Sequence, residues 1–424
     1  MQNVLFIAFH FPPFSGSSGV QRTLSFVRHL PKNNWNPVVL TADPRAYPQS
    51  SSDQIADIPQ GTVVVRTRAL DAARDLAVFG VHSRLLTTPD RWWTWRFSAV
   101  KRGLDLTRAH SARVIWSTYP IATAHRIGAR IHGRSRLPWI ADFRDPMIER
   151  DTRTGEMHPR DGRLRGARAR VEELVARHAS KVVFCTDGAR RIFLERHPRV
   201  SPQDAIVIAN GFDDGIFSEV QNASRRSAQA GQPFTLLHSG IVYPGTDRDP
   251  SPLFAAIRRL LDTGRLAPDM LRVVFRGSGH DEQLAPLIGA HRLDKIVSLA
   301  PGIPYRAAIE EMFSASALIV LQGYTSNPAI PAKLYEYLRV RRPLLAIVDP
   351  EGETAKLLAR TSVGFAASPD SVEQITLRLI ELLDSLAAGH LTRVLSQQQA
   401  LEFSREHQAG QLAEVLDSAV AHGV

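Results

Sequence analysis

Residues 4–22 read VLFIAFHFPPFSGSSGVQR, which is an apolar run, a loop of small residues and the start of a helical pattern near Gly19. The apolar run predicts a buried strand. Glycines let backbone amides approach a ligand closely, and the N–H groups at a helix start attract anions. The stretch has neither the Gly-Lys-Ser/Thr ending of a Walker loop nor a Gly-x-Gly-x-x-Gly pattern. Gly16, Ser18 and Gly19 are therefore candidate ligand contacts, with a plain tight turn as the alternative.

Short apolar runs alternate with amphipathic segments along both halves of the chain. In the first half, the expected strands are residues 4–9, 37–41, 62–66, 114–117, 139–142, 182–185 and 206–208. In the second half, they are residues 234–239, 271–276, 296–299, 318–321, 344–348 and 363–366. Strand–helix alternation predicts parallel sheets covered by helices on both faces. The expected fold class is α/β, with two doubly wound Rossmann-like domains facing across a cleft that holds the ligand.

The length of 424 residues is too great for one typical core and suits two domains. The first domain is expected to span residues 1–212. A turn signal and a polar run then predict a linker over residues 213–233. The second domain is expected over residues 234–386. Residues 387–424 have a helical pattern without a strand, and this tail can cross back to the first domain.

Composition limits the classes of protein and of site. The single cysteine, Cys185, excludes an internal disulfide and fits a reducing compartment. The N-terminus carries no basic leader, and no run of 18 apolar residues occurs, so we expect a cytoplasmic protein without a spanning helix. The fifteen histidines show no ligand spacing, so we expect no metal.

Charge is divided unevenly along the chain. Residues 1–212 hold 32 Lys+Arg and 18 Asp+Glu, a balance of +14, whereas the remainder has a balance of −4. The basic half could face an anionic membrane, an anionic substrate or nucleic acid. Nucleic acid is the weakest of these, because the basic residues are dispersed and no recognised motif occurs. The segment 89–96 places three tryptophans among arginines, which suits either a membrane interface or core packing.

Polar residues gather in the segment 139–146, at the carboxyl end of an expected strand. This is where α/β proteins place their chemistry. Asp142 or Asp145 could position an acceptor hydroxyl, and Arg144 could contact a phosphate. The alternative is a structural Asp–Arg–Asp cluster that caps the following turn.

Two further glycine-bearing loops follow strands of the second half. Ser239 and Gly240 open the first of these loops, which also carries Arg248, a candidate phosphate contact. Gly277 and Ser278 lie in the second loop, which ends the next strand. Close backbone approach to a ligand would explain the glycines, and so would a plain turn.

A polar, proline-bounded loop runs into a helix at residues 327–338, NPAIPAKLYEYL. Pro331 suits the first helical position, and the free N–H groups there can hold an anion or a hydroxyl. Lys333 and Glu336 share one face of that helix, which suits phosphate on the amides and lysine and ribose on the carboxylate. Ile330 and Leu334 are candidate contacts beside them. The alternative is an ion pair on an ordinary capped helix.

These motifs together resemble the GT-B glycosyltransferases, and within them the large family 4 of retaining enzymes. The resemblance covers nearly the whole chain and rests on short segments in a characteristic order. The segments are FPP at 11–13 with Gly16, GVQR at 19–22, ADFRDP at 141–146, IANGFD at 208–213, SG at 239–240 and PAKLYEYL at 331–338.

The resemblance implies a nucleotide-sugar donor bound mainly by the second domain and an acceptor bound by the first. Glu336 matches the second glutamate of the family's Glu-x7-Glu motif, which holds the donor ribose. The first glutamate falls at Pro328 and is missing, so Asn327 or the backbone of residues 329–331 would replace it. The family's usual Arg and Lys for the diphosphate are also out of place, and Arg248 and Lys333 are the substitutes. The family's histidine in the first domain has no clear match.

The activity implied by the resemblance is transfer of a sugar to a glycan or lipid-linked acceptor with retention of anomeric configuration. We expect a role in bacterial surface polysaccharide biosynthesis, peripheral to the inner face of the plasma membrane. The nucleotide-sugar is a substrate, and neither a cofactor nor a metal is expected. Two alternatives remain open, a sugar-nucleotide 2-epimerase of the same architecture and a noncatalytic subunit of polysaccharide assembly.

Overall fold

The computed structural model describes residues 1–15, 18–52, 54–77, 87–223, 232–245, 247–389 and 392–422. Two compact units make up the chain. The first unit comprises Met1–Arg150, Gly155–Asn210 and Arg405–Val424, and the second comprises Asp151–Thr154 and Gly211–Ser404. The candidate contact Gly16 lies outside the described residues.

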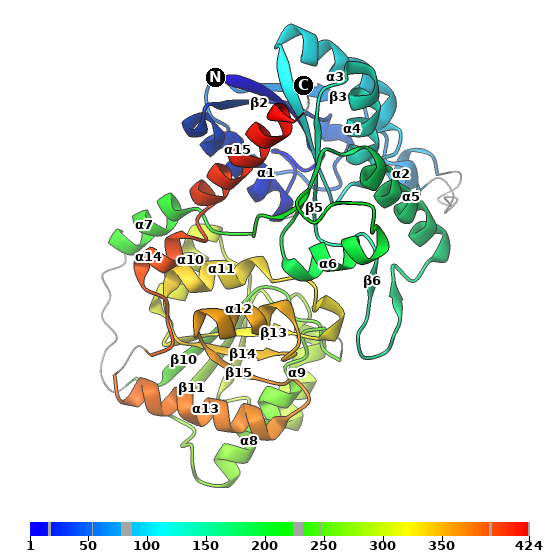
Figure 1. Cartoon of the computed structure of the whole chain (residues 1–424). Helices are drawn as coiled ribbons and strands as arrows, with labels where there is room; N and C mark the ends of the chain where they lie inside the picture. Colours follow the sequence, from blue (N-terminus) through cyan, green and yellow to red (C-terminus); the bar gives the residue numbers. More distant parts are fainter. Residues whose placement is uncertain are drawn as a thin grey trace. The chain divides into compact units, whose positions relative to one another are not determined.

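A seven-stranded parallel sheet forms the centre of the first unit (Figure 1), in the order β3-β2-β1-β4-β5-β8-β9. Its strands are β1 (Gln2–Ile7), β2 (Trp35–Ala42), β3 (Val63–Thr67), β4 (Ala112–Thr118), β5 (Trp139–Arg144), β8 (Lys181–Phe184) and β9 (Ala205–Val207). A separate hairpin pairs β6 (Glu149–Arg150) with β7 (Met157–His158). The strand order reverses between β1 and β4, which is where doubly wound sheets bind ligands.

Helices cover both faces of this sheet. They are α1 (Ser18–His29), α2 (Ala72–Asp75), α3 (Trp95–Ala109), α4 (Ala122–Ser135), α5 (Gly162–His178), α6 (Asp187–Arg196) and α15 (Arg405–Ala421). Short 3-10 helices form at Leu30–Asn33 and Pro44–Ala46. One apolar core includes Trp95 and Ile127, whereas the other packs Leu24 of α1 against Leu412 and Leu416 of α15. The end of the chain therefore completes the core of the first unit (Figure 1).

A six-stranded parallel sheet forms the centre of the second unit, in the order β12-β11-β10-β13-β14-β15. Its strands are β10 (Phe234–Ser239), β11 (Leu271–Arg276), β12 (Val297–Ala300), β13 (Ala317–Gln322), β14 (Leu344–Val348) and β15 (Phe365–Ala367). Its helices are α7 (Asp214–Ala223), α8 (Ser251–Asp262), α9 (Asp281–Ala290), α10 (Tyr305–Ser314), α11 (Ala332–Val340), α12 (Glu353–Thr361), α13 (Val372–Ala387) and α14 (Gln397–Leu401), with a 3-10 turn at Tyr324–Ser326.

The predicted α/β class with two doubly wound sheets is confirmed, because both sheets are parallel and each alternates strand with helix. The predicted linker, residues 213–233, differs from the structure in its first half. Helix α7 forms there, and Phe217 and Val220 are buried. Arg339 donates to Asp214 and, at 3.0 Å, to Ser218, so α7 is tied to α11 of the second unit.

The packing of α15 gives a prediction about stability. Leu416 is fully buried against the first sheet, so Leu416→Ala should lower the free energy of unfolding of the first unit by about 2–5 kcal/mol, measured in urea. Glu414→Ala, at an exposed position of the same helix, is the control and should change it by less than about 0.5 kcal/mol. Equal midpoints for Leu416→Ala and the unchanged protein would show that α15 does not support this core.

Candidate active site

A buried ion pair lies at the carboxyl edge of the first sheet. Arg22 Nε and Nη2 donate to the two carboxylate oxygens of Asp142 at 3.1 and 3.2 Å. Thr118 Oγ1 donates to the same carboxylate at 3.0 Å. Arg22 also donates to the carbonyls of Ala209 and Ile208, both at 3.0 Å. The pair therefore joins α1, β4, β5 and the segment after β9.

This arrangement corrects the prediction that Asp142 positions an acceptor hydroxyl. The side chain is 0% exposed and both of its oxygens already accept hydrogen bonds. A buried carboxylate needs such partners to remain charged. The structural alternative left open by the sequence is thus the one that fits Asp142.

Other polar groups gather at the same edge. Arg144 has a left-handed backbone, with φ at 60°, at an irregularity in the pairing of β5 with β8, and Asp145 next to it is half-buried. His10, in the loop after β1, stacks on Phe14 at 4.1 Å between ring centroids. Burial lowers the pKa of His10 to about 3, and the positive charge of Arg144 contributes. Its imidazole is therefore neutral at physiological pH.

His10 was missed by the sequence analysis, although it lies close enough to Arg144 for that charge to lower its pKa. The sequence feature that could have identified His10 is its position as a polar residue close after a buried strand. The neighbouring candidate Gly19 lies inside α1, where its carbonyl accepts from Thr23 Oγ1 at 3.1 Å, and the backbone of Ser18 begins that helix.

In the second unit, the loop after β10 approaches helix α11 closely. The N–H of Ser239 donates to the hydroxyl of Tyr337 at 2.9 Å. Gly240 has φ at +111°, and a Cβ at this position would lie 2.9 Å from Lys333 Nζ. The positive φ therefore favours glycine here, and any side chain would displace the end of the lysine.

Two cations converge beside Gly240. Lys333 Nζ lies 3.2 Å from Nε2 of the buried His238. Burial lowers the pKa of Lys333 to about 7, the charge of Arg248 lowers it further, and Glu336 opposes the shift. Arg248 itself lies over the ring of Tyr243, 5.3 Å from its centroid, and 3.7 Å from Asp247 Oδ2. An anionic ligand at this place would offset the mutual repulsion of the two cations.

Hydrogen bonds hold the loop that leads into α11. Gln322 Nε2 donates to the carbonyls of Ser326 and Ala329 at 2.6 and 2.8 Å. Asp247 accepts from the hydroxyls of Thr325 and Ser326 at 2.7 and 2.8 Å. The loops after β10 and β13 are thus fixed to each other, and the N-terminus of α11 is preorganised next to Lys333.

Two predicted contacts of this segment are corrected. Asn327 is buried, its amide donates to Asp349 and its carbonyl accepts from the N–H of Glu353 at 2.9 Å, so it does not replace the missing glutamate. Leu334 is fully buried and its N–H donates to the carbonyl of Pro331 at 2.9 Å, so it supports the helix from the core. Ile330 and Pro331 are partly exposed, as the prediction requires.

Glu336 lies one turn along the same helix and is partly exposed. Its Oε1 accepts from the hydroxyl of Tyr305 at 2.8 Å, which fixes the carboxylate. Tyr305 begins α10 and is 42% exposed, and the sequence analysis missed it because the contact spans two helices.

A cavity of about 500 Å³ lies at the adjoining strand ends, β11 and β12. Gly277, Ser278 and Gly279 line it together with the start of α9. The carbonyl of Ser278 accepts from the N–H of Val242 at 3.0 Å, which connects this loop to the one after β10. The structure thus brings Ser239, Gly240, Arg248, Gly277 and Ser278 to one edge of the second sheet.

Two kinds of feature are absent from the described residues. No group of three or more His, Cys, Asp or Glu side chains there is placed to hold a metal ion. Among the same residues, no helix is both long and apolar enough to cross a membrane.

Comparison with known proteins bears on the family and the fold. Residues 18–211 match the model of the glycosyl transferase 4-like domain. Residues 18–211 therefore carry a glycosyl transferase 4-like domain, and the whole chain has the fold of the GT-B glycosyltransferases. The family match covers most of the first unit, whereas the solved structures show the fold of the whole chain. A comparison with curated protein sequences gives no match.

Similar solved structures span nearly the entire chain. Anabaena Alr3699/HepE in complex with UDP is 15% identical, with a TM-score of 0.65, over 99% of this chain and 100% of that one. Sucrose-phosphate synthase from Thermosynechococcus elongatus is 14% identical, with a TM-score of 0.65, over 100% of both chains. A putative UDP-N-acetylglucosamine 2-epimerase from Listeria monocytogenes is 12% identical, with a TM-score of 0.57, over 99% of this chain and 97% of that one. The same fold therefore occurs with different activities.

The buried ion pair of the first unit generates one prediction. Asp142→Asn should destabilise the protein by about 3–5 kcal/mol in urea unfolding, because Arg22 would remain buried without its counter-charge. The double variant Arg22→Met, Asp142→Leu removes both charges and should recover most of that loss. A stable Asp142→Asn protein that has lost sugar transfer would instead make Asp142 a catalytic residue.

Lys333 generates a prediction about pH. Its protonated form is the one that attracts phosphate, so its contribution to affinity is present below about pH 7 and is lost as the pH rises above that value. The dissociation constant of a bound nucleotide-sugar, measured by calorimetry between about pH 6 and pH 9, should rise by up to about tenfold per pH unit above the pKa. Lys333→Arg should remove this pH dependence, because arginine stays charged. If the dissociation constant of Lys333→Met depends on pH as that of the unchanged protein does, Lys333 is not the group that causes the pH dependence.

Proposed function

We propose that the chain transfers a sugar from a nucleoside diphosphate sugar to a glycan or lipid-linked acceptor, with retention of anomeric configuration. The observation that carries this proposal is the convergence of Lys333 and Arg248 beside Gly240 and the N-terminus of α11. Two cations and the amides of a helix start suit a diphosphate. Glu336, held by Tyr305, then suits the ribose hydroxyls.

The proposed reaction breaks the bond between the anomeric carbon and the diphosphate oxygen. The acceptor oxygen forms its bond to that carbon on the same face, and its proton passes to the departing phosphate oxygen. Lys333, Arg248 and the helix N–H groups stabilise the charge that develops on the diphosphate. These cations make a resident metal unnecessary. The first unit would bind the acceptor through Arg144 and Asp145, with His10 beside them.

A role in bacterial surface polysaccharide biosynthesis and a cytoplasmic place at the inner face of the plasma membrane belong to the same proposal. The +14 balance of residues 1–212 supports attraction to anionic lipid. Two of the three tryptophans at residues 92–95 do not add to that support. Trp95 is fully buried and donates to Thr67 Oγ1 at 2.9 Å, and Trp92 donates to the carbonyl of Ala46 at 3.0 Å, so both pack inside the unit.

The first test is thermal stabilisation by a panel of nucleoside diphosphates and their sugars. A ligand at about a hundredfold excess over its dissociation constant should raise the melting temperature of the second unit by about 5–10 °C. Glu336→Ala should remove that shift. Glu310→Ala, at an exposed position of the neighbouring helix α10, is the control and should keep it. No shift with any nucleotide would contradict the proposed donor site.

Product analysis then separates transfer from the alternatives. Release of nucleoside diphosphate that requires an acceptor would support transfer. Conversion of the bound sugar to its 2-epimer without an acceptor would identify an epimerase. Donor binding without turnover over a panel of acceptors would identify a noncatalytic subunit, for which the proline at position 328 is the motivating observation.

A further inference from the structure

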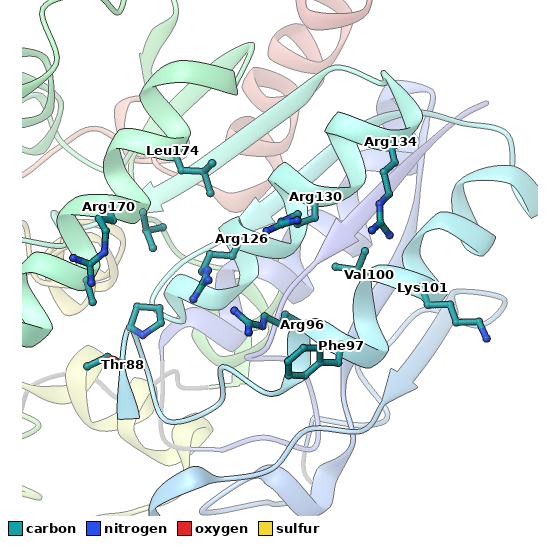
Figure 2. Close-up of a pocket in the computed structure, with 13 residues that line it drawn as sticks. Thr88, Arg96, Phe97, Val100, Lys101, Arg126, Arg130, Arg134, Arg170 and Leu174 are labelled. Carbon is teal, nitrogen blue, oxygen red and sulfur yellow. The ribbon is translucent and has the colours of Figure 1, made fainter. Parts of the chain in front are cut away.

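A second cavity lies in the first unit, among helices that the donor site does not use. Helices α3, α4 and α5 enclose a volume of about 720 Å³ (Figure 2). This size is typical of a pocket for a small organic ligand. The cavity lies in the layer of helices that covers the first sheet, and none of the residues assigned to the donor lines it.

The walls of this cavity are strongly basic. Its cationic lining residues are Arg96, Lys101, Arg126, Arg130, Arg134 and Arg170. In the part of the chain that the structure describes, none of these six forms an ion pair with a carboxylate, and none of the thirteen lining residues is acidic. Other arginines of the same unit do have such partners, for example Arg196 with Glu172 at 2.7 Å and Arg177 with Glu173 at 2.6 Å. The absence of neutralisation is therefore local to the cavity.

The cations are close enough to repel one another. Arg126, Arg130 and Arg134 follow each other at four-residue intervals, so they lie on one face of α4 with an axial spacing of about 6 Å. Figure 2 shows Arg96 gathered with Arg126 and Arg130 in the middle of the pocket. Burial lowers the pKa of Arg126, and Arg96, Arg130 and Arg170 lower it further. Asp90 opposes this shift, but its carboxylate also accepts from the N–H of Thr123 at 2.7 Å.

Apolar side chains adjoin the cations. Phe97 is 64% exposed at the rim, and its ring lies 4.6 Å from the guanidinium of Arg96. Val100 and Leu174 line the same cavity. Because cationic and apolar groups share one concave site, the ligand that fits it is an amphiphile with an anionic head and a hydrocarbon chain.

We propose that this pocket binds the diphosphate head of a single lipid-linked acceptor, with the hydrocarbon chain lying over Phe97 and Val100. The inference rests on the proposed transferase function and names the class of its acceptor. Six cations exceed what one phosphodiester would neutralise, which favours a diphosphate. The groups converge on a concave site, which a flat lipid surface would not fill. Arg126 lies about one turn from the start of α4, which follows β4, so the head would sit near the acceptor edge of the sheet.

Calorimetric titration with farnesyl diphosphate, below the concentration at which it forms micelles, tests this inference on the full chain. The double variant Arg126→Gln, Arg130→Gln should weaken its binding by about a hundredfold, because each lost charge-assisted hydrogen bond is worth about tenfold. The control Arg102→Gln, Arg113→Gln removes the same charge at exposed positions of the same unit and should bind normally. Phe97→Ser should weaken the binding of farnesyl diphosphate but leave the binding of inorganic diphosphate unchanged.

Three outcomes would overturn the inference. Equal binding by the two double variants would place the ligand elsewhere, and farnesol binding as tightly as its diphosphate would remove the role of the cations. Binding to phosphatidylglycerol vesicles that depends on Arg126 and Arg130, without any binding of farnesyl diphosphate, would make the pocket part of a general membrane surface. The nucleotide-dependent melting shift of the second unit is measured on the same variants. If nucleotides do not shift the melting temperature of the unchanged protein, that result would count against the donor site and not against the lipid pocket.

Discussion

Parallel strand pairing is the constraint on which both candidate sites depend. A parallel sheet brings the carboxyl ends of its strands to one edge, so loops that are far apart in sequence meet there. In the second unit, this places the loops after β10, β11 and β13 beside one another. The donor site proposed here is built from these loops and from the start of α11, and a single side chain, Asp247, ties two of them together.

The two units handle buried charge in opposite ways. Arg22 and Asp142 neutralise each other inside the first unit, and both also form hydrogen bonds with neighbouring backbone carbonyls or a hydroxyl. Burial is the main cause that lowers the pKa of Lys333 to about 7, and the charge of Arg248 adds to the shift while Glu336 opposes it. Neutralised charge is typical of structural pairs, whereas charge that lowers a neighbour's pKa is typical of ligand sites. The basic cavity between α3, α4 and α5 belongs to the second kind.

Much of the fold was predictable from the sequence. A short apolar run flanked by helical patterns, such as residues 344–348, predicts a buried parallel strand, and β14 spans those residues. The helix from Ala332 to Val340 was also predictable, because Pro331 marks its start. The predicted linker was wrong at α7, because the buried side chains that hold this helix meet partners far along the chain.

The sites were predictable in place but not in detail. Glycine and polar residues after strands pointed to the loops of which the proposed donor site is built, including Gly240 and Arg248. Pattern alone did not show that Asp142 points into the core toward Arg22, 120 residues away in sequence. It did not show that Tyr305 would hold Glu336. The basic cavity was likewise hidden, because its arginines come from three helices and only their packing brings them together.

The most direct test of the central claim is hydrogen exchange of the full chain with and without a stabilising nucleoside diphosphate. If the donor site is correctly assigned, amides of residues 239–248 and 330–336 should exchange more slowly with ligand bound, because their N–H groups contact or adjoin the diphosphate. Protection confined to other segments, with these two unchanged, would contradict the assignment of the donor to this edge of the second sheet.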